Sequence, residues 1–166
     1  MPDAEANARA MGEIRRLASA YGTVPFEPHV TIVDSARGEE TYLINKTIEF
    51  ARRIRPLRLD FSGLDQTDQY FRCVFARIRE TRELIDCHSL GADIFKVQKN
   101  GFMPHMSLMY GNMPAGKRAE IISGIEKDGL LDKLRGSGFG VDRLSLNIVG
   151  ADMGRWKTLK VLNLQG

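Results

Sequence analysis

A seven-residue pattern occurs twice in this chain of 166 residues, and it constrains the fold more than any other feature. The two copies span residues 26–32 and 102–108, and both read Phe-x-Pro-His-apolar-hydroxyl-apolar. They lie 76 residues apart and contain two of the three histidines, His29 and His105. Each copy follows a segment with helical spacing and is itself predicted to be a β-strand. Because the same seven-residue pattern contains two of the three histidines, we interpret them as a functional pair.

Side chains alternate along a strand, so residues i and i+2 share a face. His29 should therefore point the same way as Thr31, and His105 the same way as Ser107. Two such strands facing each other across a cleft would present two imidazoles and two hydroxyls. That set suits a phosphodiester, because a neutral imidazole accepts a proton, a charged one donates a proton, and hydroxyls can hold phosphate oxygens. No carboxylate cluster stands beside the histidines, so we predict neither a metal site nor a cofactor.

The spacing of apolar residues predicts an α+β order of ten elements. Helices are expected over residues 6–21, 40–54, 80–95 and 114–134. Strands are expected over residues 28–33, 57–61, 69–78, 103–110, 141–148 and 156–164. Residues 65–68 have turn chemistry. Residues 69–78 are apolar on both faces, which predicts a central place in their sheet.

Composition predicts one folded domain, since 43% of the residues are hydrophobic and 27% are charged. No apolar run reaches the ~18 residues of a membrane span, and the first residues lack the basic and apolar regions of a secretory leader. We therefore predict a cytoplasmic protein that does not bind membranes. Cys73 and Cys87 are interpreted as buried thiols, with a disulfide between them left open. His88 has helical spacing with apolar neighbours and is interpreted as a hydrogen-bonded structural residue.

The net charge of +3 is mildly basic, which argues against tight binding of duplex nucleic acid. The densest basic run consists of Arg52, Arg53, Arg55 and Arg58. Such a run is typical of a solvated helix end, and it could also form a rim that attracts a phosphate-bearing substrate.

The paired motifs resemble the two-histidine (2H) phosphoesterase superfamily, whose signature is two His-x-Thr/Ser motifs. Residues 104–111 read Pro-His-Met-Ser-Leu-Met-Tyr-Gly. This is similar to the Pro-His-x-Ser-Leu-x-Tyr-Gly pattern of the cyclic phosphodiesterase branch known from plants and yeast. Residues 70–75, the pair His88-Ser89 and the closing strand with Trp156 are also similar to that branch, so the resemblance covers nearly the whole chain.

The resemblance implies a two-lobed, pseudo-symmetric α+β fold in a single catalytic domain spanning residues 1–166. Each lobe would be a small antiparallel sheet with helices on its outer side, and the active site would lie in the cleft between the lobes. The lobe with the termini is expected at about residues 1–40 and 137–166, and the second at about 55–112. Family members usually have an apolar strand before the first helix. This sequence enters its first helix almost at once, so one lobe is expected to have a strand fewer, which leaves monomer and dimer both open.

The resemblance also implies metal-independent hydrolysis of a ribose cyclic phosphate. Substrates would be nucleoside 2′,3′-cyclic phosphates, opened to 2′-phosphates, or ADP-ribose 1″,2″-cyclic phosphate, opened to the 1″-phosphate. By carry-over from the family, His105 would activate water and His29 would protonate the leaving ribose oxygen, although the near symmetry leaves the reverse open. Thr31 and Ser107 would bind the phosphate.

Tyr110 would contact phosphate or ribose by the family pattern, whereas strict alternation places it among core-facing residues. Two rival functions stay open at this point. One is processing of RNA ends that carry a 2′,3′-cyclic phosphate or 2′–5′ linkages. The other is a module that binds a nucleotide without turnover.

Overall fold

The computed structural model describes residues 2, 4–99, 101–129, 138–150 and 153–165. Within these ranges the chain has an α+β fold of helices and small antiparallel sheets, as predicted. The helices are α1 (Ala4–Tyr21), α2 (Glu40–Ala51), α3 (Arg82–Phe95) and α4 (Ala115–Lys127). The strands are β1 (Leu57–Leu59), β2 (Phe61–Gln66), β3 (Val74–Ile78), β4 (His105–Met109), β5 (Phe139–Val141), β6 (Arg143–Ile148) and β7 (Lys157–Asn163). Two 3₁₀ turns are η1 (Tyr70–Arg72) and η2 (Met153–Arg155).

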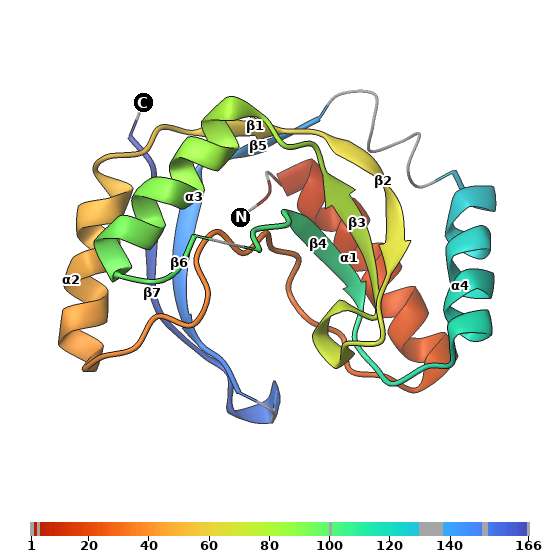
Figure 1. Cartoon of the computed structure of the whole chain (residues 1–166). Helices are drawn as coiled ribbons and strands as arrows, with labels where there is room; N and C mark the ends of the chain where they lie inside the picture. The colour runs from red at the N-terminus through yellow and green to blue at the C-terminus, as the bar shows by residue number, and fades with distance from the viewer. Residues whose placement is uncertain (1, 3, 100, 130–137, 151–152, 166) are drawn as a thin grey trace.

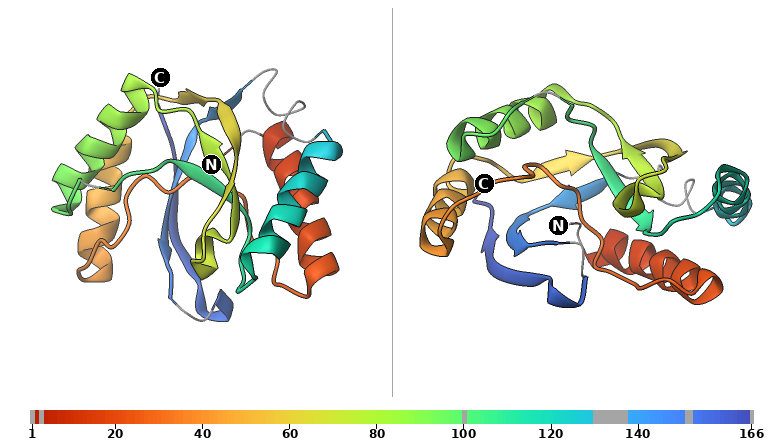
Figure 2. Two further views of the ribbon diagram at one scale, coloured as in Figure 1. Left: turned by 45° about the vertical axis from the view of Figure 1, so that its right-hand side comes forward. Right: turned by 60° about the horizontal axis from the view of Figure 1, so that its bottom comes forward.

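The strands pair in three antiparallel sheets, β2–β3–β4, β1–β5 and β6–β7. Strand β3 is central in the largest sheet, as its apolar residues on both faces predict. Helices α1 and α4 pack on this sheet, whereas α2 packs on α3 and on the β6–β7 sheet. Figures 1 and 2 accordingly show α2 and α3 at one end of the molecule, α1 and α4 at the other, and the strands between them. The lobe boundaries stay a prediction.

The two largest of three apolar clusters among the described residues follow this arrangement. The larger one joins α1 and α4 to the inner face of the β2–β3–β4 sheet, with Leu17, Val74, Met106 and Ile125 among its members. The second joins α2 and α3 to the end of the chain, with Phe50, Phe95 and Leu164 among its members. Each cluster uses the apolar stripe of its helices, which is why the helices were predictable from spacing.

The ends of α1 and α4 show how glycine sets helix length. Gly22 has a φ of 65°, and the amide of Thr23 donates to the carbonyl of Ala18 at 3.0 Å, which closes the helix as its sequence predicts. Helix α4 ends at Lys127, before Gly129, whose φ is 67°. The prediction of helix beyond residue 127 is therefore wrong at residues 128–129, and its remainder, residues 130–134, lies outside the described residues.

The predicted strand over residues 28–33 is wrong. This segment forms only an isolated antiparallel bridge, between Val30 and Met106. Pro28 has no N–H to donate to a neighbouring strand, and the carbonyl of Ile32 accepts a hydrogen bond from His88 instead. The segment is therefore extended without becoming part of a ladder.

Four other strand boundaries differ from prediction. The expected strand 57–61 divides at residue 60, because β1 pairs with β5 while β2 pairs with β3. Strand β2 continues through the expected turn at residues 65–66, where Asp65 binds Arg77 across the ladder. The expected strand 69–78 begins only at Val74, after η1. The expected strand 141–148 likewise divides, between β5 and β6.

Candidate active site

The two repeated motifs lie side by side in the folded chain. The bridge between Val30 and Met106 joins the first motif to the edge of β4. Figure 1 shows the first motif crossing the middle of the molecule beside β4. Side chains alternate along extended chain, so the residues that flank the bridge present theirs on the face opposite to Val30 and Met106. These flanking residues are the four singled out in the sequence, His29, Thr31, His105 and Ser107.

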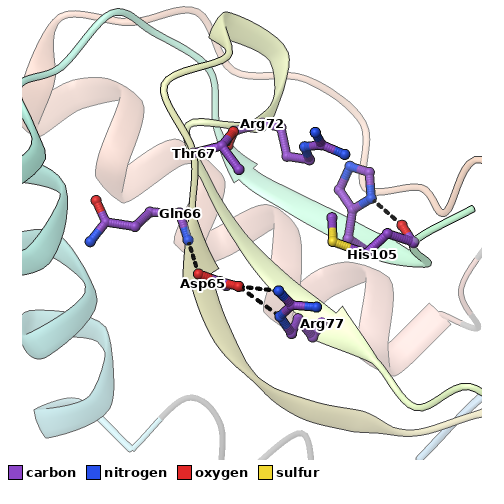
Figure 3. A network of polar contacts seen from close by, with 7 residues as sticks. Asp65, Gln66, Thr67, Arg72, Arg77 and His105 are labelled. Carbon is purple, nitrogen blue, oxygen red and sulfur yellow. Dashed lines mark hydrogen bonds and ion pairs between the residues drawn. The ribbon is translucent and has the colours of Figure 1, made fainter. Parts of the chain in front are cut away.

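The same local hydrogen bond holds both histidines. Nδ1 of His29 lies 2.7 Å from the carbonyl oxygen of Glu27, and Nδ1 of His105 lies 2.8 Å from the carbonyl oxygen of Met103. The second contact is visible in Figure 3. In each motif a proline separates the two partners and holds the residue before it in an extended conformation. The Phe-x-Pro-His pattern thus supplies an acceptor for its own histidine.

This contact fixes where each ring carries its proton. A carbonyl oxygen only accepts hydrogen bonds, so Nδ1 of His29 and of His105 must donate. In a neutral ring the free lone pair is then at Nε2. Within the described part of the chain, Nε2 of neither histidine has a hydrogen-bond partner. Both rings are therefore oriented by the backbone and keep Nε2 available for proton transfer.

The surroundings of His105 favour its neutral form. Burial lowers the pKa of His105 below its ordinary value of 6.5, and the nearby positive charges of Arg72, His29 and Arg77 lower it further. The hydrogen bond to Met103 acts in the opposite direction. At neutral pH His105 is thus a proton acceptor at Nε2. The corresponding contact of His29 is more exposed to solvent than that of His105.

The two hydroxyls of the motifs have different environments, although the sequence presents them as equivalents. Thr31 is exposed, and no hydrogen bond holds its side chain among the described residues. Ser107 is buried, and its Oγ donates to the carbonyl oxygen of Phe71 at 2.9 Å. Ser107 therefore ties β4 to the η1 turn, and in this state its proton is directed at the protein.

Tyr110 is a core residue that also touches the motif. It follows the last residue of β4, its side chain is buried, and its ring stacks on Phe26 with 3.7 Å between centroids. Burial raises the pKa of the Tyr110 hydroxyl well above its usual range, while a hydrogen bond with Ser107 acts in the opposite direction. Strict alternation along β4 would place the Tyr110 side chain on the face opposite to Ser107. The hydrogen bond with Ser107 means that alternation alone does not determine where this side chain points. Contact of Tyr110 with substrate stays a prediction.

Aromatic side chains surround this position, and two of them lie in the stretch 70–75, which the sequence analysis noted for its family resemblance without giving it a role in the site. Tyr70 and Phe71 in η1 are each 38% exposed, and their rings meet edge to face with 5.0 Å between centroids. Phe71 also contacts Tyr110 and Trp156, at 5.3 and 5.6 Å. Trp156 is anchored by donation from Nε1 to the carbonyl of Gly150 at 2.8 Å. The adjacent aromatics at positions 70 and 71 were a signal, but only the fold shows that Trp156 joins them.

Two arginines near His105 were also given no role by the sequence analysis, although Arg72 belongs to the stretch 70–75 noted for its family resemblance. Arg72 lies in η1, and Arg77 lies opposite His105 in the β3–β4 ladder. Figure 3 shows the Arg72 guanidinium directed toward the imidazole of His105, while Arg77 is directed at Asp65. They are 33 and 28 positions from His105 in the chain, so no local pattern in the sequence connects them.

The third histidine is structural, as predicted. His88 on α3 is buried, its Nδ1 lies 2.7 Å from the carbonyl oxygen of Ile32, and its Nε2 lies 3.2 Å from that of Lys99. Its ring stacks on Phe102 with 4.0 Å between centroids. His88 therefore connects the end of the first motif to the segment that enters the second.

Both cysteines are buried free thiols, as predicted, and they form no disulfide. Cys73 belongs to the larger apolar cluster and Cys87 to the second one. Burial raises the pKa of the Cys87 thiol to about 11 and also raises that of Cys73.

The four arginines of the basic run are all exposed, three of them just after α2 and Arg58 in β1. Nη1 of Arg53 lies 3.7 Å from Oε1 of Glu49 one turn earlier. The described residues contain no group of three or more His, Cys, Asp or Glu side chains placed to hold a metal ion. None of the helices described is both long enough and apolar enough to cross a membrane.

Comparison with known proteins agrees with this arrangement. A family described as "Cyclic phosphodiesterase-like protein" matches residues 5–164. A cyclic phosphodiesterase from Arabidopsis thaliana is 26% identical over 174 aligned positions, which cover 99% of this chain and 92% of that protein. The match to the family includes both histidine motifs, the η1 turn and the closing strand. The chain therefore belongs to the cyclic phosphodiesterase-like family, the branch of the 2H phosphoesterases that its paired motifs resemble.

Proposed function

We propose that this protein hydrolyses a ribose cyclic phosphodiester without a metal ion. The substrate would be a nucleoside 2′,3′-cyclic phosphate, opened to the 2′-phosphate, or ADP-ribose 1″,2″-cyclic phosphate, opened to the 1″-phosphate. The observation that carries the proposal is the pair His29 and His105. They flank one β-bridge on its open face, and each donates from Nδ1 to its own backbone so that Nε2 remains available.

The proposed reaction moves one proton at each histidine. Nε2 of His105 takes a proton from a water molecule while the oxygen of that water forms a bond to phosphorus. Nε2–H of His29 gives a proton to the ribose oxygen as the bond from that oxygen to phosphorus breaks. His105 is given the role of base because burial and positive neighbours lower its pKa, which keeps it neutral. One proton must then return from His105 to His29, through solvent, before the next turnover.

The surroundings of the histidines support a nucleotide substrate. Thr31 is exposed on the motif face and is free to donate to a non-bridging phosphate oxygen. Tyr70 and Phe71 expose part of their rings on the turn to which Ser107 is bound. Such rings are surfaces on which a nucleobase can stack, worth about 1–3 kcal/mol per base.

The test is to incubate the purified protein with 2′,3′-cyclic nucleotides and with ADP-ribose 1″,2″-cyclic phosphate in the presence of a chelator. Products are identified by phosphorus NMR. We expect release of the monophosphate by the wild type, and no turnover by His29→Ala or His105→Ala. Wild-type activity in the double variant on every cyclic phosphate would overturn the proposal, and so would activity that the chelator abolishes.

Processing of RNA ends is the second candidate, favoured by the exposed arginines at positions 52, 53, 55 and 58. It predicts that RNA with a 2′,3′-cyclic phosphate end is a better substrate than the mononucleotide. It also predicts inhibition by oligonucleotides that weakens steeply as salt is raised. Binding of nucleotide with no product from either kind of substrate would instead indicate a non-catalytic module.

A further inference from the structure

The arginines beside His105 differ in how their charges are used. Nε of Arg77 donates to Oδ2 of Asp65 at 2.7 Å, so the charge of Arg77 is paired with a carboxylate. For Arg72, no carboxylate lies within ion-pair distance among the residues that the structure describes. Nη2 of Arg72 donates to the neutral amide oxygen of Gln69 at 2.7 Å, and its Nε is buried without an acceptor. Arg72 thus keeps an unpaired charge and an unused donor.

Hydrogen bonds hold in place the turn that carries Arg72. The carbonyl of Arg72 accepts from Oγ1 of Thr67 at 2.7 Å, and that of Phe71 accepts from Oγ of Ser107 at 2.9 Å. The amide of Gly111 donates to the carbonyl of Tyr70 at 2.9 Å. These contacts hold η1 against the end of β4. Figure 3 shows the result, with the Arg72 guanidinium extended toward His105.

We propose that Arg72 binds the non-bridging oxygens of the phosphate on which His29 and His105 act, and that Ser107 positions the turn that carries it. This inference rests on the proposed function. A cyclic phosphodiester carries one negative charge, and attack by water adds charge to the same oxygens. A guanidinium offers paired N–H donors and a permanent positive charge, which matches that group better than a neutral hydroxyl does.

The charges around His105 are consistent with this assignment. Arg72 approaches it from η1, Arg77 from β3 and His29 from the first motif, and all three lower its pKa. An anion bound by Arg72 would offset part of this repulsion. Removing the charge of Arg72 should therefore raise the pKa of His105 and move the acidic limb of the kcat/KM profile to higher pH.

The test compares Arg72→Met with two matched controls. Arg77→Met removes the arginine that is paired with Asp65 and lies opposite His105 in the β3–β4 ladder, and Gln69→Ala removes the hydrogen bond to Arg72 but keeps the charge of Arg72. Two readouts are used: kcat/KM with a 2′,3′-cyclic nucleotide, and the Kd of inorganic phosphate from the imidazole resonances of His29 and His105. We expect Arg72→Met to lower kcat/KM and to raise the Kd of phosphate, each by about 10- to 100-fold, as loss of a charged hydrogen bond does. Arg72→Lys should recover part of the loss, and Gln69→Ala should stay within about threefold of wild type. Arg77→Met should weaken phosphate binding much less than Arg72→Met does, because the charge of Arg77 is paired with Asp65.

The outcomes separate this inference from the proposed function. Turnover by the wild type with unchanged phosphate binding in Arg72→Met overturns the role of Arg72 and leaves the function intact. An equal loss in Gln69→Ala also overturns it, because Arg72 would then act only by holding the turn. Arg72-dependent phosphate binding without turnover of any cyclic phosphate supports the anion site and rejects the enzyme. If Arg72→Met does not fold, Arg72→Gln and Arg72→Lys take its place, and unchanged phosphate binding in both again rejects the inference.

Discussion

Replacement of Ser107 by alanine should affect stability differently from replacement of Thr31, although the sequence presents the two motif hydroxyls as a symmetric pair. Ser107 is 6% exposed and donates to the carbonyl of Phe71 at 2.9 Å, whereas Thr31 is exposed. Loss of the Ser107 hydroxyl leaves the Phe71 carbonyl without this donor inside the protein. Thr31 faces water, so loss of its hydroxyl leaves no buried acceptor unsatisfied. We therefore expect both Ser107→Ala and Thr31→Ala to lower activity, but only Ser107→Ala to lower stability.

The expected magnitude follows from the contact that is lost. Removing one partner of a buried hydrogen bond costs about 1–3 kcal/mol, because the remaining group is left unsatisfied. The volume removed is one oxygen atom, so the cavity contributes little. For a chain of this size each 1 kcal/mol lowers Tm by about 2–4 °C, which gives a decrease of about 2–12 °C. For Thr31→Ala the expected change in unfolding free energy is within about 0.5 kcal/mol.

Urea unfolding followed by circular dichroism, together with thermal melts, measures both variants against the wild type. The m-value should be unchanged if the native fold is kept. The reasoning is refuted if Ser107→Ala unfolds at the wild-type urea midpoint, or if Thr31→Ala is destabilised by the same amount. Either result would mean that the Ser107–Phe71 hydrogen bond does not distinguish the two motifs.

Three further predictions rest on single features of the structure. Because the pKa of His105 is lowered and its neutral form is the base, the acidic limb of the kcat/KM profile should have an apparent pKa below 6.5, which a pH–rate profile measures. Burial raises the pKa of Cys87 to about 11, so mass spectrometry should find this thiol unmodified by iodoacetamide at pH 8 until the protein unfolds. A Cβ at Gly91 would lie 2.5 Å from Cγ2 of Val33, so Gly91→Ala should destabilise the protein by about 1–3 kcal/mol in urea unfolding. Gly12→Ala, in open space on another helix, should stabilise it by about 1 kcal/mol.

The helices were the part of the fold that the sequence determined best. Their apolar stripes pack into the two clusters, and Gly22 closes α1 where the sequence places its end. Strands were less predictable because their limits depend on partners distant in the chain. The chain changes sheets between β1 and β2, and nothing in the local alternation of Leu57, Leu59 and Phe61 shows that change.

The site was predictable where a local pattern determines the geometry. The Phe-x-Pro-His repeat contains both the histidine and the carbonyl that orients it, so the repeat in the sequence becomes a repeat in space. Arg72 was not predictable in this way. Its position depends on the η1 turn, which Ser107, Thr67 and Gly111 fix through contacts that only the folded chain brings together.

The third histidine explains why two similar motifs can form one site despite sharing only a single β-bridge. One bridge allows the first motif to rotate or slide relative to β4, and a shift of one residue would turn its side chains to the other face. His88 opposes such a shift, because its two nitrogens lie within hydrogen-bond distance of the carbonyls of Ile32 and Lys99 and its ring stacks on Phe102. A neutral imidazole has one N–H and can donate to only one of these carbonyls at a time. The stacking of the His88 ring on Phe102 is therefore the contact that persists whichever carbonyl accepts the hydrogen bond. The register of His29 against His105 therefore depends on α3, a helix that contributes no residue to the proposed chemistry.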